Sequence, residues 1–118
     1  MKKSQDIALE EKWEHLLDKL RQLVGKKPAD LNAVLFLIGV QELGKGIRNF
    51  SKEQKQDLMH IAVCKLLSSL GIYEFEGLDE QGWPHWKLVK KLPHVDLLEQ
   101  ESLLKSLAID YFEELDSI

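Results

Sequence analysis

The pattern of hydrophobic and polar positions sets one stretch apart, Leu31 to Leu43, which reads LNAVLFLIGVQEL. Its apolar side chains would point in every direction around a helix, and Asn32 is the one polar residue among the first ten. A helix that is apolar on all sides is buried among other helices or in a membrane. Because its 13 residues fall short of the roughly 20 that cross a bilayer, the pattern predicts a buried central helix and no membrane association.

Three further segments place apolar residues at the spacing of an amphipathic helix. They predict helices over about residues 4–24, 52–70 and 95–115. Gly25 and Gly71 follow the first two, and glycine adopts the left-handed conformation of a helix C-terminus without steric cost. Ser51 and Gln54 have the spacing of a capping box at the start of the helix predicted over residues 52–70. The boundaries of these helices are therefore set by local signals.

Between residues 72 and 92 the period changes. Residues 73–76 and 86–88 alternate in steps of two, and Gly82 lies where a hairpin loop needs a positive φ. We therefore expect a short β-hairpin that packs on the helices, since an isolated hairpin is marginally stable in water. The alternative is a helical turn that begins at Pro84, because apolar residues after it also recur in steps of three.

Together these elements predict a mainly all-α fold over residues 1–118. We expect a four-helix bundle-like single domain around the buried second helix, with the hairpin or an irregular insertion between the third and fourth helices. Short connections favour antiparallel neighbours in such a bundle. A chain of this length is typical of one domain with one hydrophobic core.

Composition and charge narrow the function classes. The chain is 44% hydrophobic and 31% charged, which is typical of a globular protein. Its net charge of −4 argues against sequence-independent binding of nucleic acid, which depends on neutralising phosphates. Residues 93–118 hold seven acidic residues against one basic residue, which most simply form a solvated helix face. The lone Cys64 and a start without a continuous apolar segment favour a cytoplasmic location.

Gly39 to Gly46 has the spacing of a phosphate-binding loop through Lys45, but Gly46 stands where Ser or Thr should hold magnesium. Such a loop follows a strand, whereas the residues before Gly44 continue the predicted central helix. A glycine helix stop with a solvated lysine is the better interpretation, and no cofactor is expected.

Metal-binding residues are the next hypothesis. His60 and Cys64 share a helix face because they lie four residues apart, and His85 and His94 follow in later segments. Two ligands from a helix and two from a loop would suit zinc. Nothing in the sequence brings the second pair near the first, and Cys64 lies in an apolar run, where cysteine usually packs as a small hydrophobe. No metal is therefore expected, and neither the Cys64–His60 pair nor the paired carboxylates favour enzymatic activity.

The most distinctive surface segment is Trp83 to Lys91, with two of the three tryptophans followed by three lysines. Its rings could pin the hairpin to the helices, anchor a protein interface, or stack on single-stranded bases. We expect Trp86 to be buried and Trp83 to be partly exposed. The residues predicted to form an interaction surface are Trp83, His85, Trp86, Lys87, Lys90 and Lys91.

These observations favour a non-enzymatic interaction or structural domain that docks to a protein partner or associates with itself, for example as a homodimer. The alternative is a small ligand- or metal-binding protein that uses His60, Cys64 and His85. No motif resembles that of a characterised family.

Overall fold

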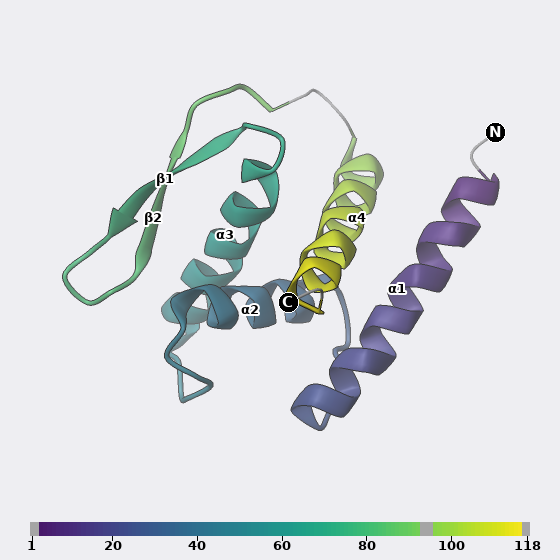
Figure 1. Ribbon diagram of the computed structural model, residues 1–118, viewed down its shortest axis with the longest axis horizontal. Coiled ribbons are helices and arrows are strands. Elements are labelled where there is room, and N and C mark those ends of the chain that lie inside the picture. The colour runs from purple at the N-terminus through teal and green to yellow at the C-terminus, as the bar shows by residue number, and fades with distance from the viewer. Residues whose placement is uncertain (1–2, 93–95, 117–118) are drawn as a thin grey trace. The chain divides into compact units, whose positions relative to one another are not determined.

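The computed structural model describes residues 3–92 and 96–116, with side chains from residue 7 onward in the first range. The chain is 64% helical, and the described residues form four helices and one two-stranded antiparallel sheet, which confirms the predicted mainly helical class and the hairpin. Each helix begins and ends within two residues of its predicted limits. The elements are α1 (Lys3–Val24), α2 (Leu31–Leu43), α3 (Lys52–Ser68), β1 (Tyr73–Leu78), β2 (Pro84–Leu88) and α4 (Leu97–Asp116) (Figure 1).

The predicted helix signals act as expected. At the start of α3 the backbone N–H of Gln54 donates to Ser51 Oγ at 3.1 Å, and the Ser51 N–H donates to Gln54 Oε1 at 2.9 Å. This capping box satisfies two backbone donors that have no partner within the helix. Gly44 follows the last residue of α2 with φ +75°, a conformation that glycine adopts without strain.

The chain forms two compact units. The terminal unit contains α1 and α4, and the hairpin unit comprises residues 32–92 with α2, α3 and the β-hairpin. The sequence-based expectation of a single domain therefore stays a prediction.

In the terminal unit α1 and α4 run parallel (Figure 1). Lys105 lies near the middle of α4. Its Nζ is 3.4 Å from Glu10 Oε2 and 5.3 Å from the centre of the Trp13 ring. About two and a half to three turns further along both helices, Lys19 pairs with Asp116. The expectation of antiparallel neighbours applied to helices joined by short connections, whereas residues 32–92 lie between α1 and α4 in the sequence. The four-helix bundle arrangement is not confirmed.

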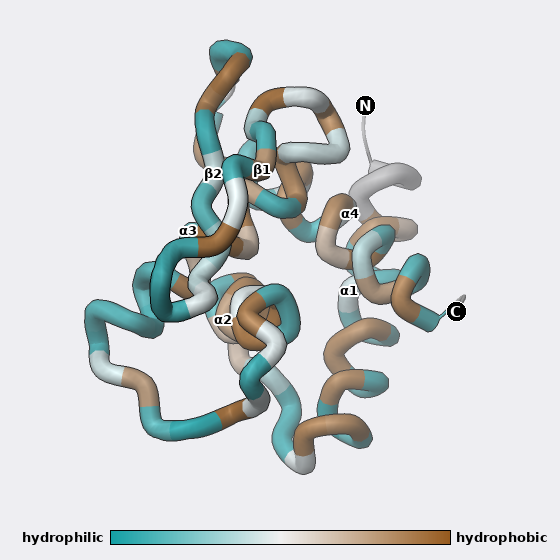
Figure 2. Tube along the Cα trace, turned by 60° about the vertical axis from the view of Figure 1, so that its left-hand side comes forward, coloured by the Kyte–Doolittle hydropathy of each residue, from teal (hydrophilic) through white to brown (hydrophobic). Residues whose placement is uncertain are grey.

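In α2 the buried positions lie nearly all round the helix, and the hydropathy trace is brown along most of it (Figure 2). Val34 and Ile38 are fully buried, as expected for this stretch, whereas Phe36 and Leu37 are half-buried. Gly39 makes the closest approach, because a Cβ there would lie 2.6 Å from the carbonyl carbon of Leu58 on α3. Since a real Cβ never comes so close, the contact between α2 and α3 requires glycine.

A core cluster ties α2 and α3 to the hairpin. Its buried members are Val40, Leu43, Phe50, Leu58 and Ile61, with Phe36 and Trp83 packed against them. The ring of Phe50 makes edge-to-face contacts with Phe36 at 5.9 Å and with Trp83 at 6.4 Å. Aromatic pairs prefer this geometry, so three segments distant in sequence are joined through one ring.

The hairpin pairs Tyr73 with Leu88 and Phe75 with Trp86, and a bulge in β1 follows Phe75. The ring of Tyr73 meets His60 of α3 at 6.3 Å, so the sheet packs one face on that helix. None of the described helices is long and apolar enough to span a membrane.

Candidate functional site

A groove of about 620 Å³ lies between α3 and the β2 side of the hairpin. From α3 it is lined by one face of the helix, at steps of three and four residues: Gln54, Asp57, His60, Ile61 and Cys64. From the hairpin it is lined by the turn and by the start of β2: Asp79, Gln81, Trp83, Pro84, His85 and Trp86. No residue of β1 lines it, so the groove lies beside the strand that ends the sheet on this side.

Among the residues that the structure describes, no further strand pairs with the outer edge of β2. The N–H of Val89 donates to the carbonyl of Ile72 at 2.9 Å, and that of Asp79 donates to Trp83 O at 2.9 Å. Along an antiparallel strand, residues whose N–H and C=O groups point toward the paired strand alternate with residues whose groups point away from it. Trp86 and Leu88 therefore direct their N–H and C=O groups away from β1. Pro84 shares this phase, which explains why a residue without an N–H is tolerated in β2.

Asp79 organises the turn that closes one end of the groove. Its Oδ1 accepts hydrogen bonds from the backbone N–H groups of Gln81 and Trp83, both at 2.9 Å, and its Oδ2 lies 3.0 Å from His85 Nε2. The hydrogen bond from the Trp83 N–H, followed by that from His85, lowers the pKa of this carboxyl. Asp79 is therefore negatively charged at neutral pH.

Lys45 is fixed to the same turn. Its ammonium donates a hydrogen bond to the carbonyl of Gln81, so it is exposed yet not simply solvated as the sequence suggested. The loop from Gly44 to Gly46 follows the end of α2 and no strand precedes it. This geometry does not match a phosphate-binding loop, whose glycines follow a strand.

Cys64 is fully buried, and its Sγ lies 3.5 Å from His60 Nε2. Burial raises the pKa of this thiol to about 11. Because the thiolate is the form that attacks substrates and binds metals, Cys64 is a protonated, packed side chain at neutral pH. The pair is therefore not poised as an activated nucleophile.

The three residues of the ligand-binding alternative, His60, Cys64 and His85, all line the groove. However, His85 pairs with Asp79, while His60 faces Cys64. Within residues 3–92 and 96–116 no three His, Cys, Asp or Glu side chains form a group that could hold a metal ion. His94, the fourth residue of that hypothesis, lies outside the described residues.

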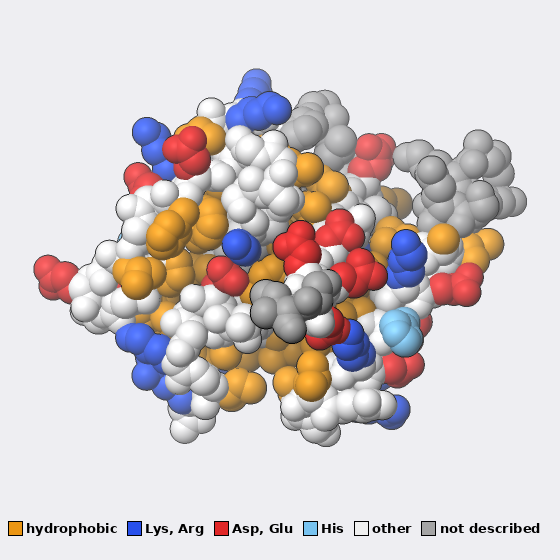
Figure 3. Space-filling model, in the orientation of Figure 1, with side chains coloured by type: hydrophobic (Ala, Val, Ile, Leu, Met, Phe, Trp, Pro, Cys, Tyr) orange, Lys and Arg blue, Asp and Glu red, His pale blue; other side chains and the backbone are white. Residues whose placement is uncertain are grey.

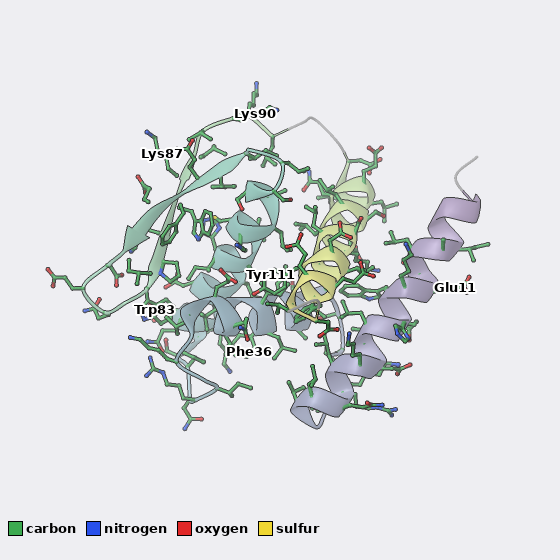
Figure 4. All side chains as sticks on the ribbon, in the orientation of Figure 1. Glu11, Phe36, Trp83, Lys87, Lys90 and Tyr111 are labelled. Carbon is green, nitrogen blue, oxygen red and sulfur yellow. The ribbon has the colours of Figure 1, made fainter. Side chains whose placement is uncertain are left out.

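The predicted surface from Trp83 to Lys91 divides between the two ends of the hairpin. Trp83 lies at the turn end near α2, whereas Lys87 and Lys90 point away from the protein at the other end (Figure 4). As expected, four residues of this segment are exposed: His85, Lys87, Lys90 and Lys91. The aromatic rings and the lysines therefore do not form one interleaved surface.

The predicted difference between the two tryptophans is not found, because both are half-buried. The ring of Trp83 contacts the ring of Phe50, so the turn covers part of the Phe50 ring. Trp86 instead contacts Phe75 at 5.3 Å, and Phe75 is itself 55% exposed. The indole N–H of Trp86 is buried and has no hydrogen-bond partner among the described residues.

A set of hydrophobic residues in and next to the hairpin is exposed, which was not predicted from the sequence. Figure 3 shows hydrophobic side chains at the surface over this element. They include Phe75, Leu78, Leu88 and Val89, with exposed fractions of 43% to 64%. The alternation of apolar and polar residues in this segment predicted strands with one packed face. It did not predict that some of the apolar side chains would lie outside the area covered by α3.

Comparisons with protein-family models, with curated proteins and with solved structures find no match to this chain. The groove and the edge of β2 thus carry the functional argument on their own.

Proposed function

We propose that the hairpin unit is a protein-interaction module that binds an extended segment of a partner protein in the groove between α3 and β2. The observation that carries this proposal is the free edge of β2 beside a groove lined by one face of α3. Addition of a strand to an exposed sheet edge is a recurring mode of peptide recognition. Backbone hydrogen bonds supply affinity, and the groove accepts alternate side chains.

The dimensions suit a short peptide. The five residues of β2 span roughly 17 Å at about 3.3 Å per residue. An added strand would pair with the outward N–H and C=O groups of Trp86 and Leu88. Every second side chain of that strand would enter the groove toward α3. The exposed side chains of Phe75 and Leu88 offer apolar area that a partner would cover.

Charge favours a partner protein over a second copy of this chain. In the register that pairs Trp86 with Leu88 of a second copy, two-fold pairing of β2 with β2 would place the two Lys87 side chains opposite each other, with Lys90 and Lys91 close behind. Two-fold pairing of β1 with β1 about Phe75 would likewise place Glu74 of each copy opposite Glu76 of the other. Like charges directly opposite each other destabilise a strand pair. We therefore propose a heterologous partner in place of the homodimer.

A small-molecule ligand in the same groove is a second candidate function. It is favoured by the volume of about 620 Å³, which lies in the range of small-molecule sites. It uses the side chains of the groove and not the backbone edge of β2, so a backbone substitution separates the two functions.

The test uses the full chain and a displayed library of random linear peptides. Peptides selected on the protein should bind in calorimetry, and Leu88→Pro should weaken that binding at least tenfold, because proline removes the outward N–H but no ladder bond. Leu88→Ala keeps the N–H and controls for the lost side chain; we expect its affinity within about threefold of the parent. Circular dichroism verifies that both variants fold.

Two outcomes would contradict strand addition. One is selected peptides that bind the Leu88→Pro and Leu88→Ala variants equally well. The other is a selection that yields no peptide that binds the folded protein.

A further inference from the structure

The turn end of the groove has its own chemistry. Asp57 of α3 and Asp79 of the turn are the two carboxylates that line the groove, and Trp83 and Trp86 line it with two half-buried indoles. The lining contains no lysine or arginine. Lys45 lies next to the turn, but its ammonium is directed to the carbonyl of Gln81. Apart from His85, which already contacts Asp79 Oδ2, this end of the groove is acidic and aromatic.

An arginine side chain matches both properties. Its guanidinium forms paired hydrogen bonds with carboxylates and stacks on aromatic faces, and it loses less hydration than an ammonium when it does so. Cations over indole rings are further stabilised by the ring quadrupole. An anionic group would meet two carboxylates here, and an apolar group would leave the Asp57 carboxylate facing it without a partner.

We infer that the partner segment places an arginine side chain at the turn end of the groove, between Asp57 and Asp79 and against the indoles of Trp83 and Trp86. This inference rests on the proposed function, since strand addition to β2 is what holds the segment there. The hydrogen bonds that Asp79 already accepts hold its carboxylate in place before binding.

The opposite end of the hairpin indicates a second charged residue in the partner segment. Lys87, Lys90 and Lys91 are exposed there, and Lys87 and Lys90 point outward (Figure 4). An acidic side chain of the partner would meet these lysines. From His85 to Lys90 the chain spans about five residues, or roughly 17 Å if extended. The recognised segment therefore carries arginine and an acidic residue about five positions apart.

The first experiment isolates the arginine site. Nα-acetyl-arginine methylamide is titrated into the full chain while the indole N–H signals of Trp83 and Trp86 are followed by NMR. The citrulline analogue, which has the same shape without the charge, serves as the matched probe. We expect shifts of both indoles with arginine and at least fivefold weaker binding of citrulline. Equal binding of the two probes, or no indole shift, would overturn the inference.

Variants of α3 locate the site. Asp57→Asn should weaken binding of the arginine probe about fivefold, the effect of one partly exposed ion pair of about 1 kcal/mol. Glu53→Gln removes an exposed carboxylate of α3 that does not line the groove. We expect its affinity to stay within twofold of the parent, and equal losses in the two variants would refute a specific site.

The second experiment separates this inference from the proposed function. Eight-residue peptides with arginine and glutamate five positions apart are compared with the same peptides containing citrulline. If both kinds bind equally and Leu88→Pro abolishes binding, strand addition stands and the arginine inference fails. If the arginine probe shifts the indoles but no peptide responds to Leu88→Pro, the groove is a small-cation site and the proposed function fails.

Discussion

A single carboxylate, that of Asp79, holds the hairpin turn in its conformation. It accepts hydrogen bonds from two backbone N–H groups and from one imidazole. These bonds add to the backbone hydrogen bonds of the turn, from the Asp79 N–H to Trp83 O and from the Gly82 N–H to Asp79 O. The same carboxylate lines the groove, so turn stability and the proposed recognition of arginine depend on one side chain.

The lowered pKa of Asp79 gives a pH-dependent prediction. A carboxyl whose pKa is lower in the folded than in the unfolded state contributes stability above its unfolded pKa of about 3.9, and this is lost as pH falls through the folded value. Asp79→Asn should therefore lower the melting temperature at pH 7. The difference from the parent should shrink when both proteins are measured at pH 3. A difference that is equal at the two pH values would contradict this role.

Cys64 gives a second prediction at this scale. With a pKa of about 11 and a fully buried side chain, it should react with a disulfide reagent at pH 8 at least a hundredfold more slowly than a free cysteine. Reaction in denaturant provides the reference rate. Fast modification of the native protein would show that the thiol is accessible and would revive its role in the ligand-binding alternative.

Side-chain chemistry was the least predictable part of the site. Sequence reasoning selected His60 and His85, because histidine is scarce and its ligand chemistry is specific. It passed over Asp57 and Asp79, since carboxylates in polar segments usually form a solvated face. Their shared position in the groove depends on the register of the hairpin and on its packing against α3, which no local pattern specifies.

At the scale of elements, the closest contact is that of Gly39 in α2 with the backbone of Leu58 in α3. We expect Gly39→Ala to lower the free energy of unfolding by about 1–3 kcal/mol, a typical cost of overpacking. This would outweigh the gain of up to about 1 kcal/mol in helix propensity. Chemical denaturation measures the change, and Gln41→Ala, at an exposed position of the same helix, is the control. A stabilised Gly39→Ala protein would show that the helices can separate without cost.

Elements were predictable because their signals are local. The capping box of α3, the glycines after the helices and the alternation on either side of Gly82 each act over a few residues. The directions of the helices were not predictable in the same way. Periodicity identifies which face of α1 is apolar, but it does not identify the neighbour that covers this face. The parallel pairing of α1 with α4 was therefore missed.

At the scale of the whole molecule, that pairing can be tested by zero-length carbodiimide cross-linking followed by mass spectrometry. We expect links from Lys105 to Glu10 and from Lys19 to Asp116, as the ion pairs place them. Lys19→Arg should remove only the second link. A link from Lys19 to Glu99 or Glu101, near the start of α4, would instead indicate antiparallel helices.

The parallel pairing of the first and last helices also sets the order of events during synthesis. The apolar face of α1 around Trp13 leaves the ribosome long before the residues of α4 exist. At about 5–20 residues per second, the delay is roughly 5–15 s. Contacts within residues 32–92 span much shorter stretches of chain and can form during this interval. During these seconds α1 lacks the contacts with α4 that it makes in the folded chain, so we expect chaperones that bind apolar helix faces to recognise it.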